Sequence, residues 1–421
     1  MADTIDIGAD VERLGTRAES MLSELGAISS DPDRRVRLFL SPEHRRAADL
    51  VASWMKDAGM TVTEDALGTV RGHWRPDLKK RFLIGSHIDT VIDAGQYDGP
   101  LGVVAGILAV KEIAARGVEL PFGIDVLAFG DEEGSRFRST LSSSLACTGR
   151  FDTSFLTLID NDGITFADAI ATYGKRVEDI PSAAYDPANV ASYIEVHIEQ
   201  GPVLEAKDLP LGVVTGIIGQ SRMRVTVTGE AGHAGTVPMR MRHDALAAAS
   251  EIMLAAERAA LANEADGMVA TVGQIEALPG ASNVIPGCVS FSLEFRSSTD
   301  EKRNAAIEQV KAFAQEVGTR RKVEVAFETL YGMNTTACTA AMQDLLADVI
   351  ARLGYEPIRM PSGAGHDAQV MARLCPTAMM FVRCRGGISH NPAEFASEQD
   401  IGLAVVALTR FIRDFAGKAT A

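Results

Sequence analysis

The chain has 421 residues, of which 46% are apolar and 23% are charged, and its formal net charge at pH 7 is −15. This length and apolar content predict a sizeable buried core and more than one domain. The acidic excess argues against nucleic-acid binding, which requires Lys and Arg to neutralise phosphates. The longest apolar run, Leu101 to Val110, is too short to cross a bilayer, so we expect no membrane span.

The ends of the chain and its cysteines bear on the cellular compartment. The amino-terminal segment lacks the basic and apolar regions of a secretory signal peptide. The five cysteines are scattered and form no CxxC motif. An odd number of thiols in a long chain is typical of a reducing compartment. We therefore expect a cytoplasmic protein whose cysteines bind no metal.

The first half of the chain alternates between helical and extended patterns. Ser41 caps a predicted helix that begins at Pro42, carries an apolar stripe from Ala47 to Met55 and ends before Gly59. Further elements are predicted as strands and a helix, at 61–64, 81–85, 102–116 (the helix), 123–130 and 193–197. Apolar strands that alternate with helices indicate an α/β layer, a mixed sheet covered by helices.

The pattern changes after about Gly216. An alternating strand at 222–228 is followed by an Ala-rich helix, two strands, a second helix and a last strand, at 243–262, 268–275, 287–296, 298–318 and 323–327. Ser298 and Glu301 form a capping box for the second helix. The order β-α-β-β-α-β is typical of a ferredoxin-like domain. We therefore predict such a domain at 216–329, inserted into a larger discontinuous domain of residues 1–215 and 330–421.

Five of the eight histidines lie in short polar segments that are rich in glycine or acidic residues. These segments, most of which follow apolar strands, are GSHIDT, EVHIEQG, GEAGHAGT, SGAGHDAQ and GGISHNPAE. Strand ends and loops are where α/β folds place their functional residues. One such histidine would be read as structural, but five together favour a functional site.

Several acidic residues near these histidines allow two interpretations each. His87 and Asp89 share one side of a strand end, either as a metal-binding pair or as a hydrogen-bonded turn. Asp98 is either a helix N-cap or a carboxylate that bridges two cations. Glu132 and Glu133 follow an apolar strand. Either one of them binds a metal ion while its neighbour reaches a metal-bound water, or both belong to an exposed acidic loop.

Five of these side chains together offer nitrogen and oxygen ligands and no sulfur: His87, Asp98, Glu133, His197 and His390. This set suits zinc, manganese, cobalt or nickel better than copper(I) or iron–sulfur clusters. In two-metal hydrolases, paired ions polarise both a water molecule and the scissile carbonyl. We therefore predict two divalent metal ions, Zn or Mn, with Co or Ni also compatible.

The motifs GSHIDTV, YDGPLGVVAG, DEEGSRF, HIEQGPVLE, GHAGTVPM, NVIPG, SGAGHDA and GISHNPAE follow one another between about residues 40 and 415. In this order they resemble the M20-type amidohydrolases of the hydantoinase/carbamoylase branch. That group includes allantoate amidohydrolases, N-carbamoyl-L-amino-acid hydrolases, β-ureidopropionase-like enzymes and ureidoglycolate amidohydrolases. The resemblance implies a dimetal catalytic domain and a lid domain that also carries the contacts of a homodimer.

The resemblance also implies roles for individual metal-site residues. His87 and His197 would hold one metal ion, and Glu133 and His390 the other. Asp98 would bridge the two ions. Glu132 would be the general base, and Asp89 would support the site from behind the ligands.

A second set of residues would handle the substrate. His233 of the lid would stabilise the oxyanion, reaching the partner subunit's site. Gln220, Asn283 and Arg296 would hold the substrate carboxylate, although Arg296 on its own sequence context is equally a surface ion-pair residue. His366 and Gly365 would shape the pocket floor.

The expected activity is hydrolysis of a carbamoyl (ureido) C–N bond in a small carboxylate, as in allantoate amidohydrolases. Alternatives are an N-carbamoyl-L-amino-acid hydrolase, a ureidopropionase-type amidase, a peptidase or acylase of the same fold, and a non-catalytic metal-binding scaffold. His197 argues against a peptidase, because peptidase branches usually place an acid there. Glu132 beside a full ligand set argues against a scaffold. Arg383 and Arg385, shortly before His390, either meet an anionic substrate or lie at the surface.

Overall fold

The computed structural model describes residues 7–419. The chain divides into two compact units, Met1–Thr215 with Ala337–Ala421 (unit 1) and Gly216–Thr336 (unit 2). The second boundary lies after Thr336 rather than after residue 329. The reason is that the last strand of unit 2, β13 (Glu324–Met333), continues well beyond its predicted end at residue 327.

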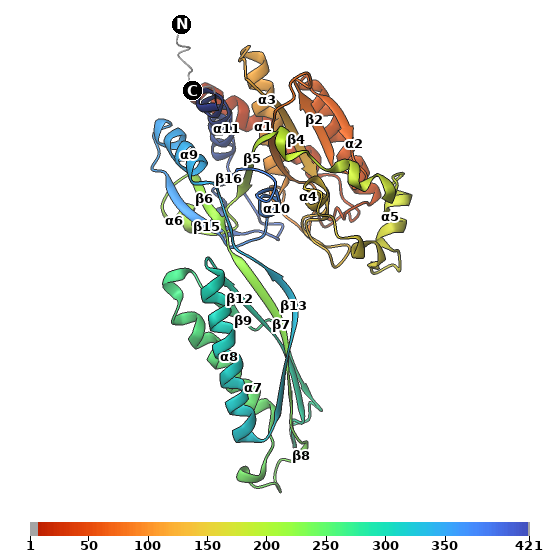
Figure 1. The fold of residues 1–421 in the computed structure, drawn as a ribbon, viewed down its shortest axis with the longest axis vertical. Coiled ribbons are helices and arrows are strands. Elements are labelled where there is room, and N and C mark those ends of the chain that lie inside the picture. Colours follow the sequence, from red (N-terminus) through yellow and green to blue (C-terminus); the bar gives the residue numbers. More distant parts are fainter. Residues whose placement is uncertain (1–6, 420–421) are drawn as a thin grey trace. The chain divides into compact units, whose positions relative to one another are not determined.

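Unit 1 is built on a mixed sheet, as the alternating pattern predicted (Figure 1). Within the described residues this sheet has nine strands, in the order β1-β2-β4-β3-β5-β16-β6-β14, with β15 paired to β6. Their bounds are Thr61–Glu64 (β1), Val70–Trp74 (β2), Arg81–His87 (β3), Gly123–Phe129 (β4), Val190–Ile198 (β5), Leu211–Ile217 (β6), Thr336–Ala337 (β14), Ile358–Ser362 (β15) and Thr377–Val382 (β16). The central strands β4, β3, β5 and β16 run parallel to one another.

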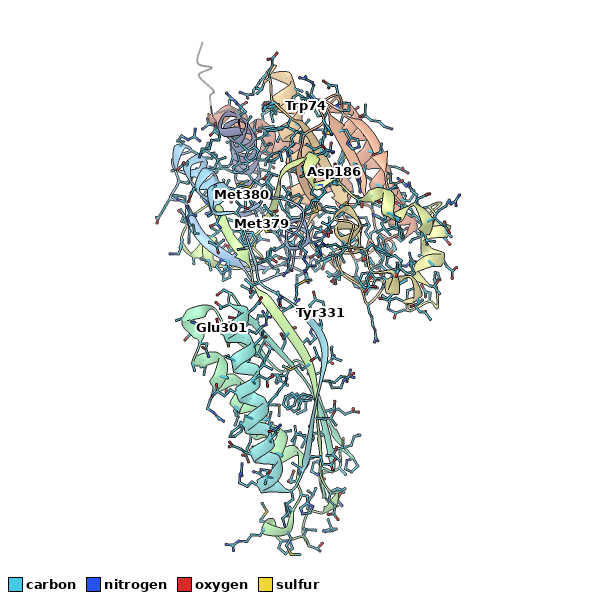
Figure 2. All side chains as sticks on the ribbon, in the orientation of Figure 1. Trp74, Asp186, Glu301, Tyr331, Met379 and Met380 are labelled. Atoms are coloured by element: carbon cyan, nitrogen blue, oxygen red, sulfur yellow. The ribbon has the colours of Figure 1, made fainter. Side chains whose placement is uncertain are left out.

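Helices cover this sheet. The longer ones are α1 (Ile7–Gly26), α2 (Pro42–Asp57), α3 (Pro100–Ala115), α9 (Ala340–Arg352) and α11 (Glu398–Ala419), and the short ones are α4 (Ser142–Cys147), α5 (Phe166–Thr172), α6 (Val203–Ala206) and α10 (Asp367–Met371). Phe82, Ile84 and Val126 of the sheet belong to one apolar core with α3 and α11. Side chains fill the space between layers densely, and Met379 and Met380 of β16 are both buried (Figure 2).

Helix α2 begins as predicted. The Ser41 side chain accepts a hydrogen bond from the backbone N–H of His44 (3.1 Å), and Pro42 occupies the first turn. The helix ends at Asp57, and Gly59 follows with a φ of +81°, a conformation that favours glycine. The apolar stripe of this helix packs into the core of unit 1.

Unit 2 has the predicted β-α-β-β-α-β order, with one strand interrupted. Its main sheet consists of β7 (Gly219–Thr228), β9 (Val269–Thr271), β10 (Ile275–Leu278), β12 (Cys288–Ser297) and β13, in the order β10-β12-β7-β13 with β9 also paired to β12. The predicted strand 268–275 is split into β9 and β10. The backbone N–H groups of Gly273 and Gln274 instead donate to the Ser292 hydroxyl (3.2 and 3.0 Å).

One face of this sheet is covered by α7 (Ala245–Leu261) and α8 (Asp300–Arg321) (Figure 1). The alternation along the strands explains why. Met223, Val225 and Phe295 point into an apolar core with the helices. The side chains of Arg222 and Arg224, at the intervening positions, stay exposed on the open face. A short ribbon of β8 (Gly232–His233) and β11 (Val284–Ile285) completes the unit.

The predicted capping box of Ser298 and Glu301 is wrong. Helix α8 begins one position later than such a cap requires, with Thr299 at the N-cap and no side-chain capping bond. Asp300 instead accepts hydrogen bonds from the Thr335 backbone N–H (2.8 Å) and from the Arg303 guanidinium (2.6 Å). Arg303, with only 3% of its side chain exposed, also donates to the Ser221 hydroxyl (3.1 Å). We call these contacts the Asp300–Arg303 anchor.

The anchor ties the start of α8 to both ends of the chain segment that forms unit 2. Ser221 lies at the beginning of β7, and Thr335 follows β13.

Over residues 7–419, no helix combines the length and the apolarity that a membrane span requires.

Candidate metal centre

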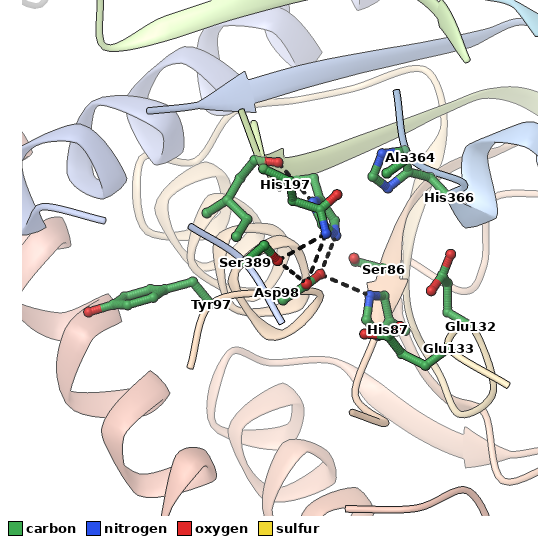
Figure 3. Close-up of polar contacts among 12 residues, drawn as sticks. Ser86, His87, Tyr97, Asp98, Glu132, Glu133, His197, Ala364, His366 and Ser389 are labelled. Atoms are coloured by element: carbon green, nitrogen blue, oxygen red, sulfur yellow. Dashed lines mark hydrogen bonds and ion pairs between the residues drawn. The ribbon is translucent and has the colours of Figure 1, made fainter. Parts of the chain in front are cut away.

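The predicted metal ligands come from one edge of the unit 1 sheet. His87 ends β3, His197 lies at the end of β5, and Glu132 and Glu133 follow β4. These three strands are parallel neighbours, so their carboxyl ends meet at the same edge. Asp98 precedes α3, and His390 lies in the segment between β16 and α11. Figure 3 shows the side chains gathered around Asp98.

The two oxygens of Asp98 face two different groups of ligands. Oδ1 lies 3.1 Å from His197 Nε2 and 3.7 Å from His87 Nε2. Oδ2 lies 3.3 Å from His390 Nε2, which in turn is 3.6 Å from Glu133 Oε2. Potential ligand atoms of His87, Asp98 and His197 form one close group, and those of Asp98, Glu133 and His390 form another. The structure thus brings all five predicted ligands together, with Asp98 common to both groups.

The two buried imidazoles are oriented by their second nitrogens. His87 Nδ1 lies 3.1 Å from the backbone oxygen of Asp89, and His197 Nδ1 lies 3.0 Å from that of Ile198. A carbonyl acceptor fixes the proton on Nδ1 and leaves the Nε2 lone pair directed at Asp98. Within the described residues, the buried Nε2 of His197 has no hydrogen-bond partner. Two electron-pair donors facing each other without a proton between them fit a site for a cation.

Asp89 supports the two glutamates rather than joining the ligand groups. Its buried carboxylate accepts the backbone N–H groups of Glu132 and Glu133, both at 3.1 Å. These bonds fix the turn after β4, so that Glu132 and Glu133 leave it beside His87. Asp89 thus lies behind the two glutamates, and its supporting role stays a prediction.

Burial dominates the electrostatics of the site. It raises the pKa of Glu132 well above its ordinary value, with His87 opposing and the charge of Glu133 adding to the shift. It also raises the pKa of Glu133, to about 7, together with the charge of Asp98. For Asp98, burial is outweighed by contacts with His197, His390 and His87, which hold its pKa well below the usual range. Carboxylates this close repel one another unless cations offset them, which again fits a metal centre.

Three residues that the sequence analysis did not select orient Asp98. Gln200 donates from Nε2 to Asp98 Oδ2 (2.9 Å), and the Ser389 hydroxyl donates to the same oxygen (2.6 Å). Glu394 Oε1 accepts the backbone N–H groups of Tyr97 (2.7 Å) and Asp98 (3.1 Å). All three lie in HIEQG and GGISHNPAE, the motifs that carry His197 and His390. Their closeness to ligands in the sequence was the available signal.

The predicted pocket-floor residues lie beside this centre. The ring of His366 packs edge-on against that of His197, with centroids 4.5 Å apart, and its Nε2 lies 2.8 Å from the Ser362 hydroxyl. A Cβ placed on Gly365 would lie 3.9 Å from Glu132 Oε1. A side chain at that position would narrow the space in front of Glu132.

Glu195, His197 and His366 form a further close group of potential ligands. Glu195, however, already accepts three hydrogen bonds: from the Tyr193 hydroxyl (3.0 Å), the Ala368 backbone N–H (2.8 Å) and the Ser86 hydroxyl (3.2 Å). We interpret this carboxylate as part of the buried support behind His197 rather than as a metal ligand.

The four predicted substrate-handling residues of unit 2 form two separate pairs. Gln220 and Arg296 are directly opposite each other on β7 and β12. The backbone N–H of Ala234, which follows His233, donates to the Asn283 backbone oxygen (2.9 Å) in the β8–β11 ribbon. Within one chain, Asn283 therefore lies apart from Gln220 and Arg296, and the prediction that all three hold one substrate carboxylate stays a prediction.

The two pairs lie at opposite ends of unit 2. Gln220 is at the beginning of β7, whereas the ribbon follows the end of that strand (Figure 1). A strand rises about 3.3 Å per residue, so the length of β7 separates the pairs by roughly 30 Å. One small substrate cannot touch both pairs of the same unit.

The two arginines before His390 are engaged by their own chain. Arg383 donates to Asp400 (two bonds of 3.0 Å) and to Asp208 (2.8 Å). The Arg385 guanidinium lies over the ring of Phe395, 4.6 Å from its centroid. These contacts favour the alternative in which both arginines lie at the surface and do not meet the substrate.

Comparison with known proteins places the chain in a family. Residues 83–414 match the family described as Peptidase family M20/M25/M40. A probable allantoate deiminase of Oryza sativa subsp. japonica is 40% identical, over 97% of this chain and 91% of its own. An N-carbamoyl-L-amino acid amidohydrolase of Geobacillus stearothermophilus is 39% identical, over 94% of this chain and 97% of its own.

A solved structure agrees with these sequence matches. The crystal structure of an amidase of the hydantoinase/carbamoylase family from Burkholderia multivorans matches with a TM-score of 0.88 and 32% identity, over 96% of this chain and 98% of that one. The chain therefore belongs to peptidase family M20/M25/M40 and, within it, to the amidases of the hydantoinase/carbamoylase family.

Proposed function

We propose that this protein is a metal-dependent amidohydrolase that cleaves a carbamoyl (ureido) C–N bond in a small carboxylate such as allantoate. The observation that carries this proposal is the position of Asp98, whose two oxygens face two separate ligand groups beside the carboxyl of Glu132. Relatives named for allantoate and for N-carbamoyl-L-amino acids, similar over nearly the whole chain, support the substrate class.

The ligand set suits two divalent ions, Zn or Mn, with Co or Ni compatible. His87 and His197 would hold one ion and Glu133 and His390 the other, with Asp98 shared. His197 Nε2 lies 3.1 Å from Asp98 Oδ1 and has no hydrogen-bond partner within the described residues, which supports this assignment. When bound, such ions polarise the scissile carbonyl and make water a better nucleophile.

Glu132 is the proposed general base. It takes a proton from the water whose oxygen attacks the carbamoyl carbon. As the C–N bond breaks, Glu132 returns this proton to the leaving nitrogen. The two backbone bonds to Asp89 hold its turn in place during the transfer.

Unit 2 would supply the substrate-binding groups and the dimer contacts. Gln220 and Arg296 would hold the substrate carboxylate, because a planar guanidinium binds a carboxylate with two parallel hydrogen bonds. His233 would stabilise the oxyanion. Its distance from Arg296 within one chain supports a homodimer in which His233 and Asn283 serve the site of the partner subunit. The five free cysteines support a cytoplasmic location.

A panel assay tests this function. The purified protein, loaded with Mn²⁺ or Zn²⁺, is incubated with allantoate, N-carbamoyl-L-amino acids, N-carbamoyl-β-alanine and a dipeptide, and released ammonia or amine is measured. We expect turnover of a ureido substrate and none of the dipeptide. The specific alternatives, an N-carbamoyl-L-amino-acid hydrolase and a ureidopropionase-type amidase, are separated by which substrate has the highest kcat/KM. Cleavage of the dipeptide alone would refute the proposal, and inactivity on all compounds would favour the non-catalytic scaffold.

A further inference from the structure

A carboxylate joins two arginines on the open face of the unit 2 sheet. Glu294 Oε1 accepts a hydrogen bond from Arg296 Nε (2.6 Å). Glu294 Oε2 accepts one from Arg222 Nε (2.8 Å) and lies 2.6 Å from Arg222 Nη2. Each oxygen of one carboxylate therefore holds a different guanidinium.

Strand pairing places these three side chains beside Gln220. Glu294 of β12 is directly opposite Arg222 of β7, and Arg296 is opposite Gln220. Because alternate residues of a strand share a face, Arg222 and Glu294 lie on the same side of the sheet as Gln220 and Arg296. This is the face away from the apolar core of unit 2.

Glu294 is the least exposed member of the group. Its side chain is 17% exposed, against 30% for Arg296 and 49% for Arg222. Burial opposes its ionisation, but the bonds from Arg296 and Arg222 hold the pKa of Glu294 below its usual value. It is therefore an ionised carboxylate fixed on both sides, and a guanidinium bound to such a group loses much of its rotational freedom.

We propose that Glu294 and Arg222 are positioning residues that fix the Arg296 guanidinium in the orientation that receives the substrate carboxylate. Arg222 binds Glu294 Oε2 and so restrains this carboxylate. Glu294 Oε1 in turn binds Arg296 and restrains its guanidinium. This inference rests on the proposed function, because it assigns a purpose to the contact between Arg296 and an anionic substrate. It adds two residues that determine how strongly the carboxylate end of a substrate is selected.

The same sheet face offers a matched control. Arg224 is the next residue of β7 on that face and pairs with Glu328 of β13 at 3.4 Å. Both of these side chains are more than half exposed, and strand pairing places Arg224 opposite Ser292, whereas Arg296 is opposite Gln220. Arg224→Gln therefore removes an arginine of the same strand and face without affecting the bracing of Arg296.

The experiment compares Glu294→Gln, Arg222→Gln and Arg224→Gln, using N-carbamoyl-L-alanine and its uncharged primary amide as substrates. For the first two variants we expect KM for the carboxylate to rise by about tenfold or more, which corresponds to one charge-assisted contact. Their kcat, and their kinetics with the amide, should change by less than about threefold. Arg222→Lys should raise KM less than Arg222→Gln does, since an ammonium keeps the positive charge but lacks the planar pair of N–H donors of a guanidinium. Arg224→Gln should behave as the unmodified protein.

Other outcomes would overturn the inference. Equal effects on the carboxylate and the amide would show a general structural role, and an unchanged KM would show that Arg296 needs no bracing. A lower KM would show that Glu294 competes with the substrate for Arg296. Calorimetric binding of N-carbamoyl-L-alanine to the same variants in a Glu132→Gln background reports the bracing without turnover. A failure of the proposed function is therefore distinguishable from a failure of this inference, and melting temperatures exclude misfolding.

Discussion

A substitution at Glu132 separates an effect on catalysis from an effect on metal binding or folding. The backbone N–H of this residue is held by Asp89, so the turn does not depend on the charge of the Glu132 side chain. We predict that Glu132→Gln keeps its metal content and its melting temperature but lowers kcat by at least about 100-fold, the usual contribution of a general base. Metal analysis and kinetics on the same sample check this. Loss of metal together with activity would instead identify Glu132 as a ligand.

His44 makes stability depend on pH. Burial and the charges of Arg37, Arg45 and Arg136 lower the pKa of its imidazole to about 3. The unfolded chain binds this proton near pH 6.5, whereas the folded protein does not. The contribution of His44 is therefore complete above about pH 6.5 and falls as the pH drops from there towards 3, by up to about 1.4 kcal/mol per pH unit.

Replacing this histidine removes that dependence. His44→Gln should give a free energy of unfolding that declines less steeply between pH 6.5 and pH 5 than that of the unmodified protein. Denaturant titrations at several pH values measure the two slopes. Parallel curves for the two proteins would show that His44 binds its proton equally well in the folded and the unfolded chain, so that folding does not lower its pKa.

For single residues, the sequence predicts the metal ligands better than it predicts the residues that hydrogen-bond to them. His87, His197 and His390 stand out because several histidines in polar, Gly-rich segments are unusual. Ser389 and Gln200 are ordinary polar residues, and only the folded chain shows that both donate to the same oxygen of Asp98. Likewise, nothing local indicates that Glu394 accepts the backbone N–H of a residue nearly three hundred positions away.

Helix α8 carries the clearest stability determinant among the elements. Removing Asp300 would leave the Arg303 guanidinium buried without its carboxylate, which is costly. We predict that Asp300→Ala lowers the free energy of unfolding by at least about 2 kcal/mol. The control is Glu308→Ala, which breaks the exposed Glu308–Lys311 pair of the same helix and should cost less than about 0.5 kcal/mol. Urea titration of both variants decides this, and equal costs would show that the anchor contributes little.

Whether an element could be predicted depends on where its determining contacts lie. Helix α2 was predictable because its cap, its apolar stripe and its terminating glycine are all local in sequence. The start of α8 was not, because Asp300 is engaged by Thr335 from beyond β13. The split between β9 and β10 has the same cause, since Ser292 of a neighbouring strand binds the intervening backbone.

For the whole molecule, the separation between His233 and Arg296 predicts complementation between inactive subunits. A Glu132→Gln chain and a His233→Ala chain should each be nearly inactive. In a mixed dimer, one site would combine an intact Glu132 with the partner's intact histidine. Random mixing of equal amounts should restore about a quarter of the unmodified activity. Separately purified chains are mixed under dissociating conditions, reassembled and assayed. No recovery in verified mixed dimers would show that each chain serves its own site.

This separation could not be read from the sequence, because motifs have an order but no distances. GHAGTVPM and NVIPG follow one another along the chain as neighbours of one domain. Only the strand register shows that their residues meet in the β8–β11 ribbon, while Gln220 and Arg296 meet at the other end of β7.

The two ligand groups around Asp98 differ sharply in their access to solvent. The side chains of His87 and His197 are each 1% exposed, whereas that of His390 is 50% exposed and its backbone has a φ of +54°. A chelator should therefore empty the two positions in sequence, first the one that depends on His390. Dialysis against increasing chelator, with metal counted per chain, should pass through a species that retains one ion. Preparations of this enzyme could then contain metal and still be incomplete, so that low activity would report how they were stored rather than which substrate they prefer.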